Sequence, residues 1–135
     1  PISLPIEWKD TLDSQVDATL SANGVSKSQI KSAFAKSMTI DMLGSAQSFN
    51  FIDDSVKIYV DKVGGTAPIL IASKHGIPAN ATTLTFDVIS SDIKDFFTAD
   101  LREMTLKFNT KANQGILSNT QVHYKMEFNV TYTPL

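Results

Sequence analysis

The sequence predicts an all-β fold, an antiparallel β-sandwich of about seven or eight strands with one or two short helical turns. Apolar and polar residues alternate along several short segments, which is the pattern of strands that bury one face. Turn-forming Gly, Pro and Asn residues separate these segments. No strand pattern alternates with a long helical pattern, so a parallel sheet is not expected. A closed barrel is the alternative, because a sequence does not show whether the sheet edges meet.

The segment from Thr120 to Tyr132 carries the clearest strand pattern. We expect its apolar residues to face the core, and His123, Lys125 and Glu127 to face solvent. The expected core residues are Val122, Tyr124, Met126, Phe128 and Val130, and Tyr132 continues the alternation. The other segments with this pattern are Met38–Met42, Val56–Val60, Ile69–Ile71, Leu84–Val88 and Met104–Phe108.

Turn signals separate the expected strands. Gly64-Gly65 predicts a hairpin turn, and His75-Gly76-Ile77-Pro78 breaks the chain before the next strand. The Asn- and Gly-rich stretch Thr110–Asn119 predicts a hairpin loop between the last two strands.

Two segments show helical signals. Ser91-Asp92 predicts a capped helical turn across one end of the sandwich, with an apolar face made of Ile93, Phe96 and Phe97. Ser26 and Gln29 match a capping box, which favours either a helix over Ile30–Phe34 or an irregular lead into the strand at Met38.

The first 25 residues are less regular. Apolar residues alternate in Ile2–Trp8, where Pro5 fits only an edge strand or an extended arm. Val16–Leu20 forms another short alternation, and Asn23-Gly24 then turns the chain. We therefore expect a single β-sandwich domain over 1–135, with 1–25 as an extended N-terminal arm or edge strand and 37–135 as the sandwich core. The arm either adds an edge strand to its own chain or is donated to a neighbouring chain.

Composition excludes several classes of function. The formal net charge is -2 and Arg102 is the only arginine, so no arginine cluster can bind phosphate and nucleic acid is not an expected partner. Cysteine is absent, which excludes disulfides and thiolate chemistry. No apolar run approaches the ~20 residues of a transmembrane helix.

Few residues suggest a chemical site. His75 and His123 are the only histidines, and we expect both to be surface imidazoles. Asp53-Asp54 is the only adjacent acidic pair, and one of its side chains is expected to cap a turn. Asp10, Asp13 and Asp17 come closest to a calcium site, against the simpler interpretation that they are solvated acids. We therefore expect no catalytic, cofactor-binding or metal-ligating residues, and no enzyme activity.

Three further motifs are read as surface features. Tyr59 beside Lys57 is expected to be a single exposed tyrosine rather than a stacking platform for bases. The Asn-x-Thr sequences at Asn80 and Asn129 are expected without a functional role.

Part of the chain resembles a known group of domains. The resemblance lies in Ser48–Val60, Ile71–Lys74, Ile77-Pro78, Thr83-Leu84 and Asp92–Phe96. These segments are similar to small exported or lipoprotein-type β-sandwich domains of Gram-negative bacteria, whose function is uncharacterised. The resemblance implies an Ig-like sandwich and a place in the cell envelope. It supplies no catalytic residues.

The combined expectation is a non-enzymatic cell-envelope module, either binding or accessory structural. A surface rich in Ser, Thr and Asn favours export to the periplasm or cell surface, and a lipid anchor outside the given chain fits as well. Another envelope protein or a glycan is the expected partner. One alternative is a structural subunit that assembles by strand addition, and the other is a small hydrolase with a scattered-acid site.

Overall fold

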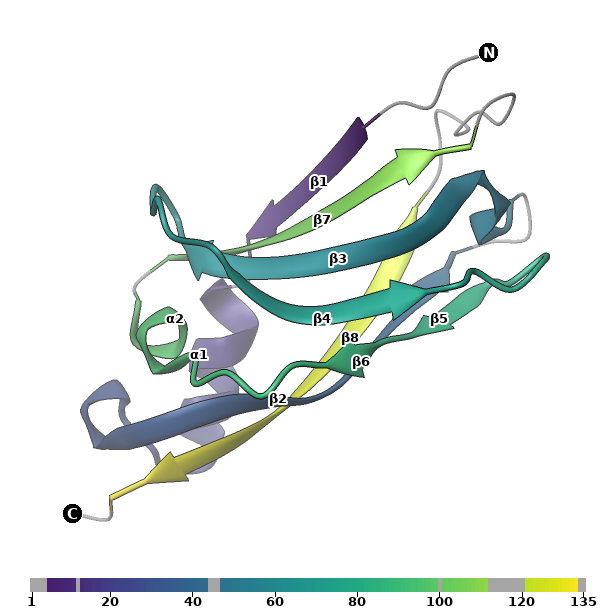
Figure 1. Ribbon diagram of the computed structural model, residues 1–135. Coiled ribbons are helices and arrows are strands. Elements are labelled where there is room, and N and C mark those ends of the chain that lie inside the picture. The colour runs from purple at the N-terminus through teal and green to yellow at the C-terminus, as the bar shows by residue number, and fades with distance from the viewer. Residues whose placement is uncertain (1–4, 12, 44–46, 100, 112–120, 134–135) are drawn as a thin grey trace.

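The computed structural model describes residues 5–11, 13–43, 47–99, 101–111 and 121–133, without the side chains of 11, 13–17 and 97. It contains two antiparallel sheets (Figure 1). The five-stranded sheet has the order β1 (Pro5–Thr11), β7 (Arg102–Thr110), β3 (Ile52–Lys62), β4 (Ile69–His75) and β6 (Asp87–Val88). The three-stranded sheet has the order β5 (Thr83–Thr85), β2 (Ile30–Met42) and β8 (Val122–Tyr132). The helices are α1 (Asp13–Ala22) and α2 (Lys94–Thr98), with 3₁₀ turns η1 (Lys27–Gln29) and η2 (Phe49–Phe51). The predicted antiparallel β-sandwich is confirmed.

The core lies between the inner faces of the two sheets. The predicted inward residues of three strands are buried, except Met42, which is half-buried at the end of β2: Met38, Ile40, Val56, Ile58, Val60, Met104, Leu106 and Phe108. The Gly64-Gly65 hairpin is also confirmed, because β3 pairs with β4 and Gly64 adopts a φ of 79° that a side chain would disfavour. Period-two alternation therefore identified the core face of these strands correctly.

Strand β8 keeps its predicted alternation but is only half-buried. Its inner side chains from Val122 to Val130 are partly exposed, while His123, Lys125 and Glu127 face solvent. Tyr132, at the end of the strand, is 48% exposed. The reason is position: β8 ends its sheet, and an edge strand has a neighbour on one side only.

The predicted hairpin between the last two strands is wrong. Strand β7 pairs with β1 and β3 in one sheet, while β8 pairs with β2 in the other. The connection therefore crosses from sheet to sheet. Residues 112–119 of the predicted loop lie outside the described residues. Alternation shows which face of a strand is buried, but it does not show which strand is the partner.

The predicted strand Leu84–Val88 divides between the two sheets. Strand β5 pairs with β2, and β6 pairs with β4 after the chain passes the buried Phe86. The amide of Phe86 donates to the Met38 carbonyl at 3.0 Å. One extended segment thus joins both sheets along one side of the sandwich, while β1 and β8 end the sheets on the other.

The N-terminal arm forms an edge strand of its own chain. Strand β1 pairs with β7 from Pro5 to Thr11, and Trp8 packs edge-on against Phe108 at 5.1 Å between ring centroids. Residues 1–4 lie outside the described residues.

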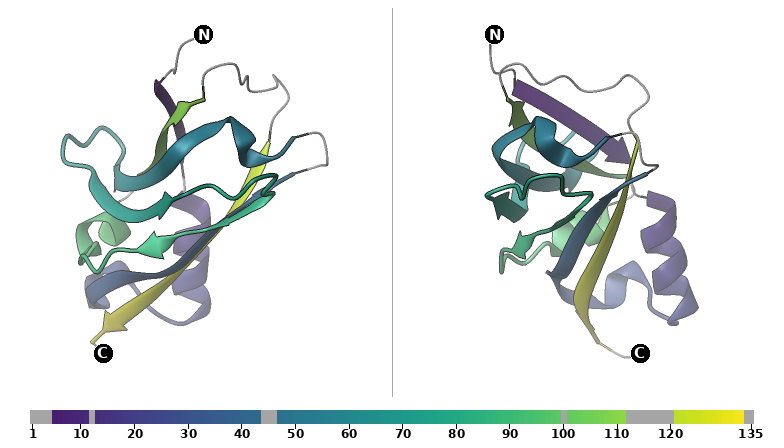
Figure 2. Two further views of the ribbon diagram at one scale, coloured as in Figure 1. Left: turned by 45° about the vertical axis from the view of Figure 1, so that its right-hand side comes forward. Right: turned by 90° about the vertical axis from the view of Figure 1, so that its right-hand side faces the viewer.

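The short alternation in Val16–Leu20 forms no strand, because helix α1 spans it, and the extended arm expected over 1–25 ends at Thr11. Asn23-Gly24 ends this helix: the Val25 amide donates to the Leu20 carbonyl at 2.9 Å, and Gly24 has a φ of 69°. Leu20 and Val25 are both buried and flank this glycine-capped helix end. The Asn23-Gly24 pair was the signal for it in the sequence. Figure 2 shows α1 on the side of the molecule away from β4.

The capping box at Ser26 forms, but it starts no α-helix. The Ser26 amide donates to Gln29 Oε1 at 2.8 Å around the single 3₁₀ turn η1. Strand β2 begins at Ile30, so the alternative of a helix over Ile30–Phe34 is wrong. Gln29 also holds the end of β8, because its Nε2 donates to the Thr133 carbonyl at 3.1 Å.

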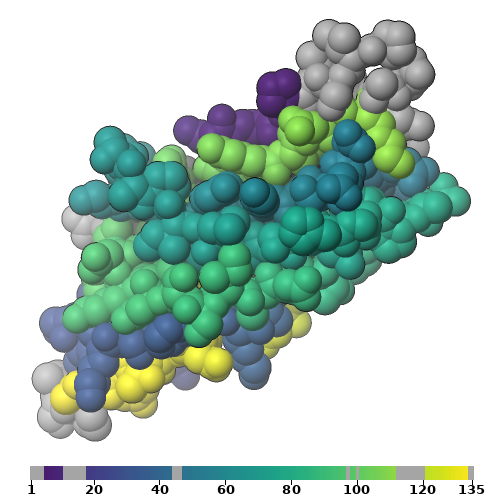
Figure 3. Space-filling model, viewed as in Figure 1, coloured from purple at the N-terminus to yellow at the C-terminus, as the bar shows by residue number. Residues whose placement is uncertain are grey.

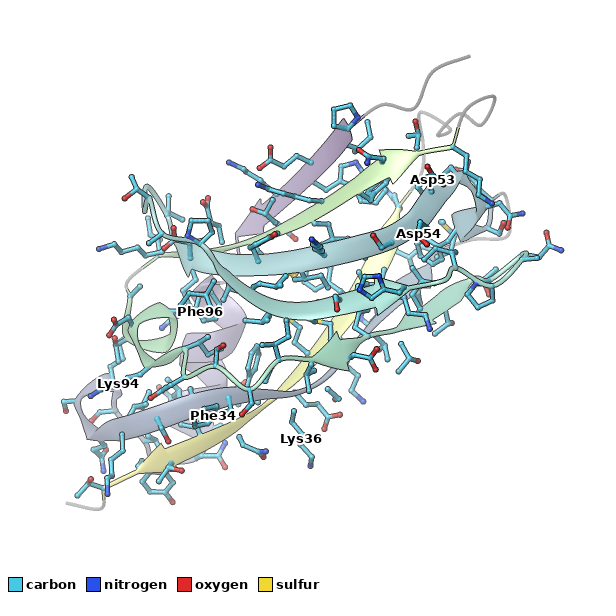
Figure 4. The ribbon with its side chains drawn as sticks, viewed as in Figure 1. Phe34, Lys36, Asp53, Asp54, Lys94 and Phe96 are labelled. Atoms are coloured by element: carbon cyan, nitrogen blue, oxygen red, sulfur yellow. The ribbon has the colours of Figure 1, made fainter. Side chains whose placement is uncertain are left out.

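Helix α2 forms where Ser91-Asp92 predicted it. Asp92 Oδ1 accepts from the amides of Lys94 and Ala33, each at 3.0 Å, and therefore joins the helix start to strand β2. Phe96 is buried and Lys94 is exposed (Figure 4). The side chain of Phe97, also predicted on the apolar face, lies outside the described residues.

Deletion of residues 1–9 tests the intramolecular pairing of β1. The truncated protein should keep the mass in solution of the intact protein but lose at least ~2 kcal/mol of unfolding free energy, because Trp8 no longer covers Phe108. Light scattering and thermal melting measure the two properties, with Lys9→Ala as a control. An oligomeric intact protein that becomes a folded monomer on truncation would instead show that the arm is donated.

Replacement of Asp92 tests the junction of α2 and β2. Asp92→Ala should lower the unfolding free energy by about 1–2 kcal/mol, because two backbone amides lose their acceptor. Asp92→Asn keeps an oxygen at this place and should cost less. Urea denaturation measures both variants, and equal stability of Asp92→Ala and the unsubstituted protein would disprove the role.

Candidate functional site

The open side of the sandwich carries a groove between strands β1 and β8. Among the described residues, β1 pairs only with β7 and β8 only with β2, so each has a backbone edge without a strand partner. A groove of about 410 Å³ separates them. It is lined by Glu7, Trp8, Lys9, Asp10, Met104, Leu106, Val122 and Tyr124, and we call it the edge groove. Four consecutive residues of β1 line it, which places the main chain of that strand at the groove as well as its side chains.

The floor of the edge groove is apolar and held in place by aromatic packing. Trp8 is half-buried, and its ring lies 5.1 Å from Phe108 and 6.2 Å from Phe51 between centroids. Such tilted and edge-to-face pairs fix the orientation of a ring beyond what burial alone does. Met104 and Leu106 are buried beside it. The floor is therefore a preformed apolar surface.

A hydrogen bond spans the edge groove. The Tyr124 hydroxyl of β8 donates to the Asp10 carboxylate of β1. This bond links the two edge strands across the gap between the sheets, so it fixes their separation.

The two faces of β8 differ sharply. Apolar residues occupy alternate positions on its half-buried inner face: Val122, Tyr124, Met126, Phe128 and Val130. Its outer face carries His123, Lys125 and Glu127. Charges on an edge strand hinder unspecific pairing with other sheets, so β8 combines an apolar inner row with protection against aggregation.

Both histidines are exposed, and neither lies in the edge groove. His123 Nδ1 lies 4.0 Å from Asp41 Oδ2, and Thr83 Oγ1 donates to Asp41 Oδ1 at 2.6 Å. The threonine thus bonds the acid and not the imidazole, so these three residues do not form a nucleophile–base pair. The contacts among Thr83, Asp41 and His123 could not be predicted, because the three residues belong to three strands and a sequence does not give the register between strands.

The acidic candidates lie apart from one another. Asp53 and Asp54 sit at an irregularity of β3, where Asp54 has a φ of 62° and its carbonyl accepts from the Gly76 amide at 2.8 Å (Figure 4). Their side chains are exposed, and neither caps a turn among the residues that the structure describes, so the predicted turn cap is not found there. The irregularity gives them a backbone role in bending β3.

The calcium candidates are split between two elements. Asp10 belongs to β1, while Asp13 and Asp17 belong to α1 and their side chains lie outside the described residues. Within the described part of the chain, no three His, Asp or Glu side chains lie close enough to hold a metal ion.

Tyr59 is half-buried rather than fully exposed. Lys107 Nζ lies 5.1 Å from the centroid of its ring, and Lys107 lies directly opposite Lys57 on the neighbouring strand. Asn80 and Asn129 are exposed, and Asn80 exchanges hydrogen bonds with Asn50 at 2.7 and 2.9 Å.

Comparisons with known proteins found no match to this chain. No protein-family model, curated protein or solved structure matches it. Of the helices described, none has the length and apolar character to cross a membrane. The site is therefore interpreted from its own chemistry.

Glu127 on the outer face of β8 has a perturbed titration that can be measured. Ser37 Oγ donates to its Oε1 at 2.7 Å, and this hydrogen bond, with attraction from Lys125 and Lys36, holds the pKa of Glu127 below its ordinary value. A lowered folded-state pKa means that the ionised carboxylate stabilises the fold above its ordinary pKa. This contribution is lost as the pH falls through the lowered value.

Ser37→Ala should therefore raise the pKa of Glu127 toward its ordinary value. Carbon-detected NMR titration of the carboxyl group measures the shift. Lys36→Ala serves as the matched variant and should shift the pKa less, because its attraction is a weaker cause. An unchanged pKa in Ser37→Ala would contradict the assigned cause.

Proposed function

We propose that this chain is a non-enzymatic binding module that takes up an extended segment of another protein as an added strand in the edge groove. The observation that carries the proposal is the presence of two unpaired strand edges, β1 and β8, on either side of one apolar groove. In strand addition, main-chain hydrogen bonds along an open edge give affinity, and pockets for alternate side chains give specificity. The edge groove offers both.

The apolar side chains on the inner face of β8 determine which sequence pattern a bound segment needs. Its apolar side chains from Val122 to Val130 repeat every second residue, so a strand beside it would place its own alternate side chains over the same face. Trp8 and Leu106 line the groove and offer an apolar contact for one bulky side chain. A fitting segment therefore alternates apolar and polar residues.

The polar groups of the edge groove suit binding. Glu7 and Lys9 are exposed, and the hydrogen bond from Tyr124 to Asp10 crosses the groove, so an entering strand displaces this bond.

The cell envelope is the proposed setting. The Ser-, Thr- and Asn-rich composition and the resemblance to exported or lipoprotein-type domains of Gram-negative bacteria support it. A partner in the periplasm or at the cell surface, with this module exported and held by a lipid anchor outside the given chain, fits both observations.

Peptide titration tests the proposal. A capped nine-residue peptide that alternates Val and Thr should shift amide NMR signals of β8 and β1. Val122→Glu places a charge in the edge groove and should weaken binding at least about tenfold. Lys31 lies on β2 and does not line the groove, so Lys31→Glu is the matched control and should leave peptide binding unchanged.

Backbone methylation of the peptide makes the test specific for strand addition. Alternate N–H groups of a strand point to opposite edges, so methylation of the odd or the even amides should abolish binding in one series, or in both if the peptide pairs with β1 and β8 at once. Binding of both methylated series at the affinity of the unmethylated peptide would disprove strand addition. Self-association that the same Val122→Glu variant abolishes would assign the groove to a second copy, which is the structural-subunit alternative.

A further inference from the structure

The outer face of the five-stranded sheet forms a second surface beside the edge groove, and Glu7 of β1 lines both. Strands β3 and β4 cross the front of the molecule, and no helix passes in front of them (Figures 1 and 3). The alternation that buries Val56, Ile58 and Leu106 turns their polar neighbours outward. This face therefore presents side chains from β1, β7 and β3 side by side.

Lys107 lies at the centre of this face. The strand register places it opposite Glu7 on one side and Lys57 on the other. Its Nζ lies 3.9 Å from Glu7 Oε1 and 5.1 Å from the Tyr59 ring centroid, so two neighbours hold it. Lys57 has no ion-pair partner within the described part of the chain. Like charges directly opposite each other destabilise a strand pair, so the Lys57–Lys107 pair costs stability.

Two hollows flank the Glu7–Lys107 pair, and both residues line each hollow. The larger has a volume of about 530 Å³, and its other polar residues are Asp53, Ser55, Lys57 and Asn109. The smaller has a volume of about 100 Å³, and Tyr59, Asp61, Glu103 and Thr105 are among its lining residues. Two adjoining hollows suit a chain of at least two units better than a single small molecule.

The donors and acceptors of this surface select the ligand class. Carboxylates only accept hydrogen bonds, lysine ammonium groups only donate, and Ser and Asn do both. An anion would meet Glu7 and Asp53, and a cation would meet Lys57 and Lys107, each with repulsion. A ligand whose polar groups both donate and accept hydrogen bonds can bind the carboxylates and the ammonium groups alike. Sugar hydroxyls have this property.

Two more features favour a sugar over a peptide. The central strands of a sheet have their main-chain groups paired with neighbouring strands, so a ligand on this face can bond only to side chains. A hydroxyl-dense ligand makes more such bonds per unit length than a peptide. Tyr59 adds an aromatic surface for the C–H groups of a sugar ring. We propose that this face binds a neutral oligosaccharide across the Glu7–Lys107 pair.

Isothermal titration calorimetry tests this site. The neutral probes are hexamers of β-1,4-linked glucose, α-1,4-linked glucose and β-1,4-linked N-acetylglucosamine, and we expect at least one to bind. Lys57→Ala and Tyr59→Ala should each weaken that binding about tenfold or more. Tyr59→Phe keeps the ring and should retain most of it. Lys125→Ala, on the other sheet, is the control and should bind as the unsubstituted protein does.

Two further probes distinguish other ligand classes. Binding of galacturonic acid hexamer alone would show an anion site, and binding of a Ser-Gly repeat peptide alone would show a peptide site. Either result, or no binding of any neutral hexamer, would overturn the proposal. So would hexamer binding that survives both Lys57→Ala and Tyr59→Ala. Val122→Glu should leave hexamer binding intact, which separates this site from the edge groove.

Discussion

The burial of the Arg102 guanidinium is the constraint on which one end of the sandwich depends. Arg102 is fully buried, and a charged group withdrawn from water is costly unless it is hydrogen-bonded. Its Nε donates to the Phe96 carbonyl at 3.0 Å, at the C-terminal end of α2, where the helix dipole favours a cation. Helix α2 in turn fixes Ala33 of β2, because Asp92 accepts from the Ala33 amide and the Ile93 amide donates to its carbonyl at 2.8 Å. A chain of hydrogen bonds thus runs from β7 in one sheet through α2 to β2 in the other.

The opposite arrangement holds on the side of β1 and β8. There the sheets end in strands that belong to different sheets and have no strand between them among the described residues. Trp8 fills part of the gap from β1, and Tyr124 reaches Asp10 across it. The two sheets are therefore joined along the side of β5 and β6, and they are joined again at the end where α2 lies. They are not joined by a strand along the edge groove. The proposed peptide site is a consequence of this asymmetry.

Much of the fold could be predicted from local pattern, and much of the site could not. The alternation of Val56, Ile58 and Val60 identified a core strand, because burial of one face requires a period of two. The same pattern in β8 indicated its inner face but not its partner, since strand pairing depends on residues far apart in the sequence. The edge groove joins Trp8 to Val122 and therefore had no local signal. Because Arg102 is the only arginine, the sequence excluded an arginine cluster. The burial of Arg102 could not be predicted, because it depends on where α2 lies.

The crossing of the chain at Phe86 has a mechanical consequence. Because β5 and β6 are two halves of one extended segment, tension applied to one sheet passes through Phe86 directly into the other. The sheets cannot slide past each other without breaking the hydrogen bond from Phe86 to Met38 and the pairing of β6 with β4. The molecule should therefore yield to a pulling force first at the β1 edge, where peeling of the strand breaks its pairing with β7 and the hydrogen bond from Tyr124 to Asp10 but leaves the pairing of β2 with β8 intact.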